Sequence, residues 1–236
     1  MASIKDHKGY NQGFQRTETF KIRIERRANM MIMQMNNISD KSKILEIGCG
    51  TGEISNFIAK ETLAKVTGID ICKPFIEIAK KDFELSNLNY EVRDFLEYDL
   101  EAVEKYDYII GNGILHHLYY NLENSLKTMN NLLKKDGKII FMEPNIYNPY
   151  CFLIFKIFRK WANLDPDEMA FSKTFIKNFL ERENYSKVKV SFKDFLLPNT
   201  PPFLVKTVII FSDFFEQIFP INLITQSIFI TASKNK

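Results

Sequence analysis

The feature that most constrains the fold of this chain is a glycine-rich segment that follows a short apolar run. Residues 44–52 read Ile-Leu-Glu-Ile-Gly-Cys-Gly-Thr-Gly, and a helical pattern begins at Glu53. Glycine tolerates positive φ angles and lets a ligand lie against the backbone, close to the unpaired N–H groups of a helix N-terminus. The segment therefore predicts a strand, a tight turn and a helix that together bind a nucleotide or cofactor. A tight turn without a ligand is the alternative reading.

Strand and helix patterns alternate on the C-terminal side of this turn. Strand-like runs lie at 43–48, 64–70, 89–93, 106–111 and 137–143, and helical patterns at 53–61, 73–85 and 115–133. Such alternation is typical of right-handed crossovers and of a mostly parallel sheet that is covered by helices on both faces. Two later strands are expected at 187–192 and 223–233. The fold class is therefore α/β.

The length and composition fit one globular domain. The chain has 236 residues, of which 45% are hydrophobic and 26% charged. We expect an N-terminal arm or lid over 1–40, a cofactor-binding core over 41–145, and acceptor-side insertions with the last two strands over 146–236. The formal net charge of +3 is too small to favour a nucleic-acid partner. A basic run on the expected helix 19–35, which contains Arg23, Arg26 and Arg27, is read as a solvated face.

Acidic residues around the glycines discriminate between cofactor classes. Asp70 ends the second strand, where a carboxylate accepts hydrogen bonds from both ribose hydroxyls of an adenosine, although helix capping is an alternative. A dinucleotide fingerprint would need glycine in place of Glu53, whose charge repels a pyrophosphate. Glu46 precedes the turn and suits a cationic amino group better than a phosphate. These residues favour S-adenosylmethionine over a nicotinamide cofactor.

Four ordered motifs resemble the class I S-adenosylmethionine-dependent methyltransferases, of the small-molecule type with a Leu-Glu-x-Gly-Cys-Gly-Thr-Gly loop. Besides the loop and Asp70, they are residues 93–95, 110–118 and 132–138. The resemblance implies a Rossmann-like three-layer sandwich with a seven-stranded, mostly parallel sheet and an antiparallel last strand. It also implies a cofactor site that comprises Glu46, Gly48, Cys49 and Gly50 in the loop, Asp70 and Ile71 at the ribose, Asp94 and Phe95 at the adenine, and Asn112, whose backbone lies near the methionine moiety.

Two histidines follow the fourth strand, at the carboxyl edge of the sheet where open α/β folds bind ligands. Methyl transfer from a sulfonium needs mainly alignment, and a base only when the acceptor carries a proton of high pKa. His117 aligns with the histidine of the family's motif and is the expected base or acceptor-orienting group. His116 and Glu143 are alternative catalytic residues. Structural roles stay open for all three, as a packed histidine or a partnered carboxylate. We expect no metal site.

The acceptor is expected to be a small, apolar molecule. The chain has 21 phenylalanines, concentrated in its last third, and the resemblance implies that the segments after strands four and five choose the acceptor. The Glu143-Pro144-Asn145 sequence, the apolar insertion and the helix start at Phe171-Ser172 resemble bacterial methyltransferases that act on lipid-linked, polyketide or glycan intermediates. O-methylation is favoured because a histidine base suits a hydroxyl and no nucleophilic cysteine site is recognisable.

Residues 202–219 form an apolar helix candidate that is interrupted by Lys206, Asp213 and Glu216. The segment is too short to span a membrane. A core or lid helix is the first expectation. A dimer face, or peripheral membrane contact through 150–161 or 202–219, stays open. The sequence does not fix the oligomeric state.

Cellular location and competing functions follow from the remaining features. The three cysteines are widely spaced and the N-terminus has no apolar leader, so a reducing, cytoplasmic location is expected. The alternatives to O-methylation are an N-methyltransferase of a small amine, a non-catalytic scaffold that binds S-adenosylmethionine, and an NAD(P)-dependent oxidoreductase.

Overall fold

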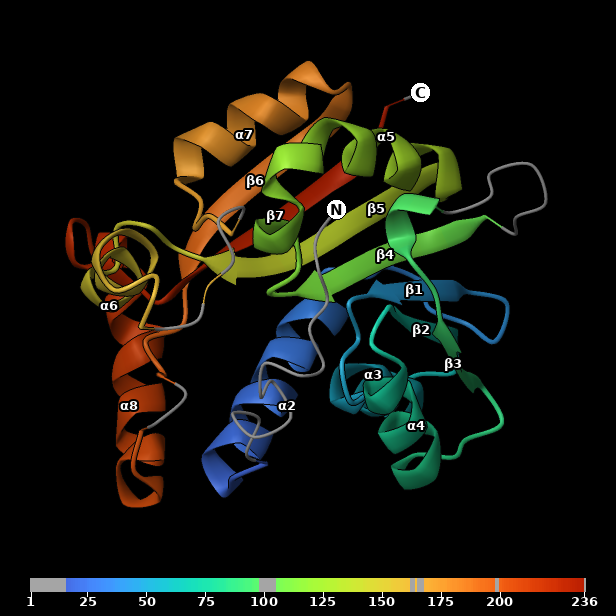
Figure 1. Cartoon of the computed structure of the whole chain (residues 1–236), viewed down its shortest axis with the longest axis horizontal. Helices are drawn as coiled ribbons and strands as arrows, with labels where there is room; N and C mark the ends of the chain where they lie inside the picture. The colour runs from blue at the N-terminus through green and yellow to red at the C-terminus, as the bar shows by residue number, and fades with distance from the viewer. Residues whose placement is uncertain (1–15, 98–104, 162–163, 165–167, 198–199, 236) are drawn as a thin grey trace.

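A seven-stranded sheet organises the chain in the computed structural model, which describes residues 16–97, 105–161, 164, 168–197 and 200–235. The strand order is β3-β2-β1-β4-β5-β7-β6, and β7 is antiparallel to both of its neighbours (Figure 1). The expected α/β fold with an antiparallel last strand is confirmed. The strands are β1 (Lys43–Ile47), β2 (Lys65–Asp70), β3 (Leu88–Val92), β4 (Tyr106–Asn112), β5 (Leu133–Pro144), β6 (Tyr185–Lys193) and β7 (Ser227–Lys234).

Two helical layers cover the sheet because alternate strand residues point to opposite faces. Leu45 and Ile109 pack with α5 (Leu122–Leu132) and α7 (Lys173–Arg182) in the larger core cluster. Ile44 and Ile110 pack on the other face with α2 (Glu18–Ile32) and α3 (Glu53–Glu61). A smaller cluster holds α4 (Lys73–Asp82) against Cys49 and Tyr90. The three layers of the sandwich are visible in Figure 1.

Helix boundaries differ from the sequence expectation near the fourth and fifth strands. The helix expected over 115–133 is a 3-10 helix, η3 (Leu115–Asn121), followed by α5. β5 begins at Leu133 rather than at Gly137. Leu133 already pairs with Tyr106 of β4, and the register between β4 and β5 then shifts before Lys138 pairs with Tyr108. Asp136, with a φ of +63°, lies within this irregular part of the strand. The η3 turn brings both histidines to the carboxyl edge of the sheet.

The apolar segments after β5 are also shorter helices than expected. Residues 147–161 contain α6 (Pro149–Phe152) and a short π-helix, η4 (Leu153–Ile157). The helix expected over 202–219 is α8 (Pro202–Phe215), followed by η5 (Ile221–Ile224). Only Val205 and Ser212 of α8 are buried, so the expectation of a core helix is wrong. No helix among the described residues is long and apolar enough to cross a bilayer.

Candidate cofactor and acceptor site

The turn between β1 and α3 leaves its backbone open to a ligand. Gly48 and Gly50 have φ angles of +63° and +54°, which side chains other than glycine rarely adopt. A Cβ added to Gly50 would meet no atom within 4 Å, whereas one on Gly48 would collide with Ile114 at 2.6 Å. The N-cap of α3, Gly52, makes no side-chain capping bond. The geometry is therefore that of a ligand-binding turn at a helix N-terminus.

Asp70 lies beside this turn, at the carboxyl end of β2. Its Oδ2 accepts a hydrogen bond from the Gly50 N–H and its Oδ1 one from the Cys72 N–H, each at 2.8 Å. Burial raises the pKa of Asp70, and the two backbone bonds and the nearby His117 oppose that rise. Each carboxylate oxygen has a second lone pair, so the side chain can still accept from a ribose. The next residue, Ile71, is exposed.

The predicted adenine residues lie after β3. Asp94 is half-buried, and its Oδ1 accepts a hydrogen bond from the Leu96 N–H at 2.8 Å. Phe95 belongs to the larger core cluster and is almost fully buried. Much of its ring therefore packs against the protein, and contact between Phe95 and an adenine stays a prediction. Leu96, which the sequence did not single out, is the exposed apolar side chain at this position.

Glu46 and Cys49 lie underneath the turn. Burial raises the pKa of Glu46 to about 8, while a hydrogen bond from the Ser55 hydroxyl opposes the rise. Burial and the nearby Glu46 raise the pKa of the Cys49 thiol well above its usual value. At neutral pH, Glu46 is thus mostly protonated and Cys49 is a thiol. A cationic group placed next to Glu46 would favour its ionised form.

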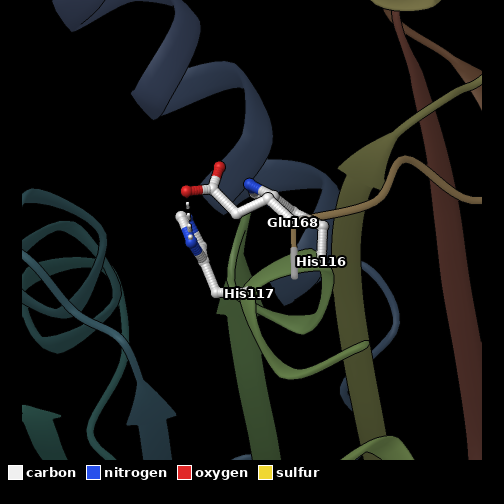
Figure 2. Close-up of side chains that lie close together, drawn as sticks. All are labelled: His116, His117 and Glu168. Carbon is white, nitrogen blue, oxygen red and sulfur yellow. Dashed lines mark ion pairs between the residues drawn. The ribbon is translucent and has the colours of Figure 1, made fainter. Parts of the chain in front are cut away.

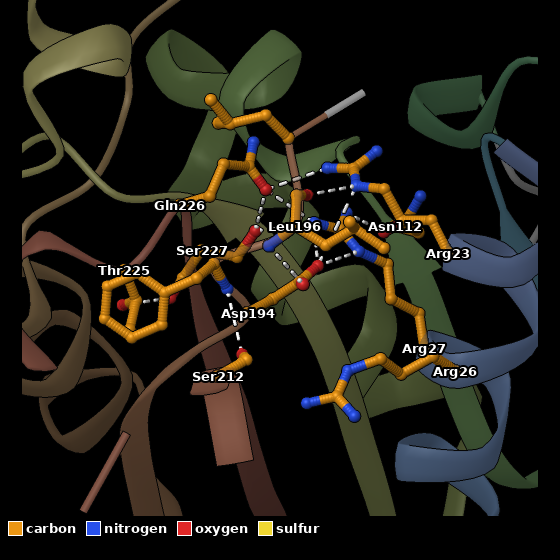
Figure 3. Close-up of polar contacts among 12 residues, drawn as sticks. Arg23, Arg26, Arg27, Asn112, Asp194, Leu196, Ser212, Thr225, Gln226 and Ser227 are labelled. Carbon is orange, nitrogen blue, oxygen red and sulfur yellow. Dashed lines mark hydrogen bonds and ion pairs between the residues drawn. The ribbon is translucent and has the colours of Figure 1, made fainter. Parts of the chain in front are cut away.

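Asn112, at the end of β4, is held by a buried cluster of charges (Figure 3). Its Oδ1 accepts a hydrogen bond from Arg27 Nη1 at 2.8 Å. Arg27 also donates through Nε and Nη2 to Asp194 Oδ2, at 2.9 and 2.8 Å, and through Nη2 to Gln226 and Ser227. The cluster ties α2 to the loop after β6 and to the start of β7. The cluster thereby holds the side chain of Asn112, which precedes the η3 turn that contains the two histidines.

Arg23 belongs to the same cluster, which corrects the reading of the basic run as a solvated face. Arg23 and Arg27 are buried, and Arg23 donates to Leu196 O and Gln226 Oε1. Burial and the adjacent Arg27 lower the pKa of Arg23 to about 9, and Asp194 opposes this. The pKa of Asp194 is lowered because the attraction of the two guanidinium groups outweighs its burial. The counter-charge lies more than 160 residues away in sequence, so helix periodicity gave no sign of it.

Glu143 binds the turn that carries the two histidines. Its Oε1 accepts from the N–H groups of Ile114 and Leu115, at 3.0 and 2.8 Å, and its Oε2 from the His116 N–H at 3.3 Å. Oε2 also lies 2.9 Å from His116 Nδ1. Burial, and then the charge of His117, lower the pKa of His116. These contacts are those of a partnered carboxylate and a packed histidine, the arrangement that the sequence left open beside a catalytic one.

His117 lies beside a carboxylate that the sequence did not identify. Its Nδ1 is 3.5 Å from Glu168 Oε1, and the side chains of His117 and Glu168 are 31% and 2% exposed (Figure 2). Glu168 follows η4 in the chain, and the Met169 N–H, which donates to His116 O at 3.2 Å, holds this segment against the histidine turn. The pairing joins segments that are 51 residues apart in sequence, so no local motif could have indicated it.

The same three side chains have the spacing of a metal site. One ligand atom each of His116, His117 and Glu168 lie within 4.8 Å of one another. Because Glu143 occupies Nδ1 of His116, Nε2 is the nitrogen that His116 could offer. Two imidazoles and a carboxylate can bind a transition metal. Alternatively, His117 can act as a base with Glu168 as its carboxylate partner. Removal of metal ions with a chelator distinguishes a metal site from such a base.

The residues of the turn fit S-adenosylmethionine. The open backbone at Gly50 leaves room for the methionine moiety, Asp70 has lone pairs left for a ribose, and Glu46 can ionise next to an ammonium group. A family model described as a methyltransferase domain matches residues 38–187. The chain belongs to this family. The class I S-adenosylmethionine-dependent methyltransferase that the motifs indicated is thereby confirmed as the class of this domain.

Individual similar proteins agree with this assignment. The malonyl-[acyl-carrier protein] O-methyltransferase of Acetivibrio thermocellus is 29% identical over 122 residues, which are 50% of this chain and 42% of that protein. The chain thus spans less than half the length of this curated relative. An S-adenosylmethionine-dependent methyltransferase from Archaeoglobus fulgidus has a TM-score of 0.65 and 21% identity, over 91% of this chain and 94% of that one. The Haemonchus contortus phosphoethanolamine N-methyltransferase 2, solved with S-adenosylmethionine, has a TM-score of 0.64 and 15% identity, over 89% of this chain and 53% of that one.

Proposed function

We propose that this methyltransferase transfers the methyl group of S-adenosylmethionine to an oxygen of a small, largely apolar acceptor that is linked to a carrier or a lipid. The relative that methylates an oxygen of a carrier-linked acyl group supports this acceptor class. The phenylalanine-rich segments after β5 supply apolar side chains on the acceptor side. Contact with a membrane through 150–161 or 202–219 would accompany a lipid-linked acceptor, which is met at a bilayer, whereas a carrier-linked acceptor does not need it.

The pairing of His117 with Glu168 is the observation that favours an oxygen over a nitrogen as the atom that is methylated. The methyl donor supplies an activated methyl group on a sulfonium and leaves as S-adenosylhomocysteine. Glu168 faces Nδ1 of His117, which favours a proton on Nδ1 and a lone pair on Nε2. In our proposal, Nε2 accepts the proton of the acceptor hydroxyl while the oxygen bonds to the methyl carbon. The resulting imidazolium then lies next to the buried carboxylate of Glu168, which stabilises it.

Other residues of the site would bind the methyl donor or hold His117 in place. Asp70 and the turn at Gly50 would hold the donor, and His117 is close enough to Asp70 to oppose the rise that burial causes in the pKa of Asp70. Glu143 fixes the backbone from which His117 projects, through its bonds to Ile114 and Leu115. We assign no proton transfer to Glu143 or His116. Both oxygens of Glu143 already accept hydrogen bonds, and His116 is buried next to Glu143, with its pKa lowered by that burial.

Release of S-adenosylhomocysteine from matched acceptors tests the proposal. 4-Pentylphenol, 4-pentylaniline and a malonyl thioester of pantetheine offer a phenol, an amine and a carboxylate. We expect turnover with an oxygen acceptor. With the phenol, His117→Ala should lower kcat by about 100-fold or more with unchanged affinity for S-adenosylmethionine, whereas a carboxylate acceptor carries no proton for the base to accept. Glu168→Gln should reduce kcat less and move the acidic limb of the pH profile to lower pH, because the imidazolium loses its carboxylate partner.

Other outcomes would select other functions. Turnover of the aniline alone would replace O-methylation by N-methylation. Binding of S-adenosylmethionine without turnover of any acceptor would favour a scaffold. A change in kcat of less than about threefold in His117→Ala would reduce His117 to a packing residue, since a general base contributes at least about 100-fold.

A further inference from the structure

Helix α8 carries most of its apolar side chains on the outside of the protein. Phe203 is 80% exposed, Ile210 and Phe214 are each 61% exposed, and Phe211 is also exposed. The helix extends away from the end of the sheet, next to α2 (Figure 1). Soluble monomers rarely expose a contiguous apolar surface of this kind without using it for binding.

A second segment, from α6 through η4 to Trp161, is exposed in the same way. Phe152, Ile157 and Phe158 are exposed, and Trp161 is 91% exposed. Lys156 and Lys160 are exposed among these side chains. The sequence contains no aspartate or glutamate between Tyr147 and Leu164. The segment is therefore apolar, aromatic and purely basic.

The two segments form one end of the molecule, which we call the aromatic end (residues 147–161 and 202–224). Asn148 Nδ2, at the N-cap of α6, donates to Ile224 O in η5 at 2.6 Å. Asn222 Nδ2, also in η5, donates to Glu216 O after α8 at 3.4 Å. In Figure 1, α6 and α8 lie at the same end of the sheet.

Acidic groups near the aromatic end have basic partners. Asp213 pairs with Arg26 at 2.5 Å, and Glu216 pairs with Lys193 at 2.7 Å. Among the described residues of the aromatic end, the exposed charged side chains outside these pairs are Lys156, Lys160 and Lys206. Aromatic side chains interspersed with lysines are typical of segments that lie in the interface of an anionic membrane.

We infer that the aromatic end binds the surface of a bilayer that contains anionic headgroups. The phenylalanines and Trp161 enter the boundary between headgroups and acyl chains, and the lysines contact the lipid phosphates. This inference extends the proposed function for the case of a lipid-linked acceptor, which such a surface would present to the protein.

The aromatic end is connected to the candidate site by direct contacts. Phe155 of η4 packs edge-on against the His116 ring, with 5.7 Å between ring centroids. Arg159 Nη1 donates to Glu168 O at 2.8 Å. A segment that lies on lipid thus also holds the backbone of the residue that faces His117. An acceptor that leaves the bilayer at this segment would arrive next to the proposed base.

Trp161 provides a direct test, because it is the only tryptophan of the chain. The purified protein is titrated with vesicles of phosphatidylcholine alone and of phosphatidylcholine with phosphatidylglycerol, without methyl donor or acceptor. We expect a blue shift of the tryptophan emission, quenching by lipids brominated on the acyl chain, and co-sedimentation, all preferring the anionic vesicles. Because no turnover is measured, this result is independent of the acceptor and of the base.

Two variants and a control locate the surface. Lys156→Gln with Lys160→Gln should weaken binding to the anionic vesicles by about 30-fold, at about 1 kcal/mol for each lysine. Phe211→Ser with Phe214→Ser should weaken binding to both kinds of vesicle. Leu63→Ser, at an exposed leucine outside the aromatic end, should bind as the unaltered protein does. Circular dichroism and the melting temperature confirm that each variant is folded.

The inference is overturned if the protein does not sediment with either vesicle and the Trp161 emission does not change. It is also overturned if, in the absence of lipid, light scattering shows a dimer and the Trp161 emission is shielded from quenching by acrylamide, since the aromatic end would then be an interface between copies of this chain. In either case the methyl-transfer proposal would stand on its own assay.

Discussion

Glu46 provides a quantitative test of the chemistry underneath the glycine turn. Burial raises its pKa from 4.5 to about 8. Between these two values the folded chain keeps a proton that the unfolded chain releases, so the free energy of unfolding falls as the pH rises. The loss is about 1.4 kcal/mol for each pH unit, or about 3 kcal/mol by pH 7 relative to pH 4.5. Below pH 4.5 both states are protonated and the effect vanishes.

Glu46→Gln removes this titration and keeps an oxygen that can accept the hydrogen bond from Ser55. The variant should be more stable than the unaltered protein by about 3 kcal/mol at pH 7, and by less than about 1 kcal/mol at pH 5. Urea unfolding at pH 5, 6, 7 and 8 measures the difference. Glu61→Gln, at an exposed residue of α3, is the matched control and should show no such trend. A stability difference for Glu46→Gln that is constant from pH 5 to 8 would refute the reasoning.

The same variant tests the proposed contact with the methyl donor. If the ammonium group of S-adenosylmethionine lies next to Glu46, binding ionises the carboxyl and releases about one proton at pH 7. Calorimetric titration in buffers of different ionisation enthalpy measures this release. It should disappear in Glu46→Gln. Equal proton release in both proteins would place the ammonium group elsewhere.

Three further predictions address other parts of the site. Asp70→Ala should weaken binding of S-adenosylmethionine by about 100-fold, because a buried ribose loses a charged acceptor worth about 3 kcal/mol, with the fold intact by circular dichroism; unchanged affinity in calorimetry would contradict the ribose assignment. Arg27→Met should lower the free energy of unfolding by about 3–5 kcal/mol, and adding Asp194→Asn should restore part of the loss, because an unpaired buried charge is the main cost; an additive double variant in urea unfolding would argue against the pairing. Dialysis against a chelator should leave turnover unchanged if His117 acts as a base beside Glu168, whereas loss of turnover that a divalent ion restores would assign these residues to a metal site instead.

Much of the fold could be predicted because it depends on local patterns. The turn at Gly48 and Gly50 needs positive φ angles that the sequence itself reveals. Alternating strand and helix patterns fix the order of the elements, and the right-handed crossover rule then gives a mostly parallel sheet. Asp70 could be placed beside the glycine turn for the same reason, since the carboxyl ends of neighbouring parallel strands lie at one edge. The cofactor class followed from these local features.

The boundaries of the elements after β4, and the contacts of the residues there, could not be predicted from local sequence patterns. Glu143 was a candidate catalytic residue by position. Its bonds to Ile114, Leu115 and His116 depend on the loop after β4 folding back over the end of β5. A carboxylate that accepts several backbone N–H groups looks the same in sequence as one that faces a substrate. Only the three-dimensional bonding pattern distinguishes them.

The sequence by itself determined the sheet, the cofactor turn and the family, because short-range periodicity and glycine conformation are encoded in neighbouring residues. The tertiary structure decided the charge pairs of Arg27 with Asp194 and of His117 with Glu168, and the exposure of α8. These features join segments that are far apart in the chain, and the energy of a buried charge depends on which partner the fold brings within a few ångströms. For the same reason, an apolar helix such as α8 looks alike in sequence whether it packs in a core or lies on the surface.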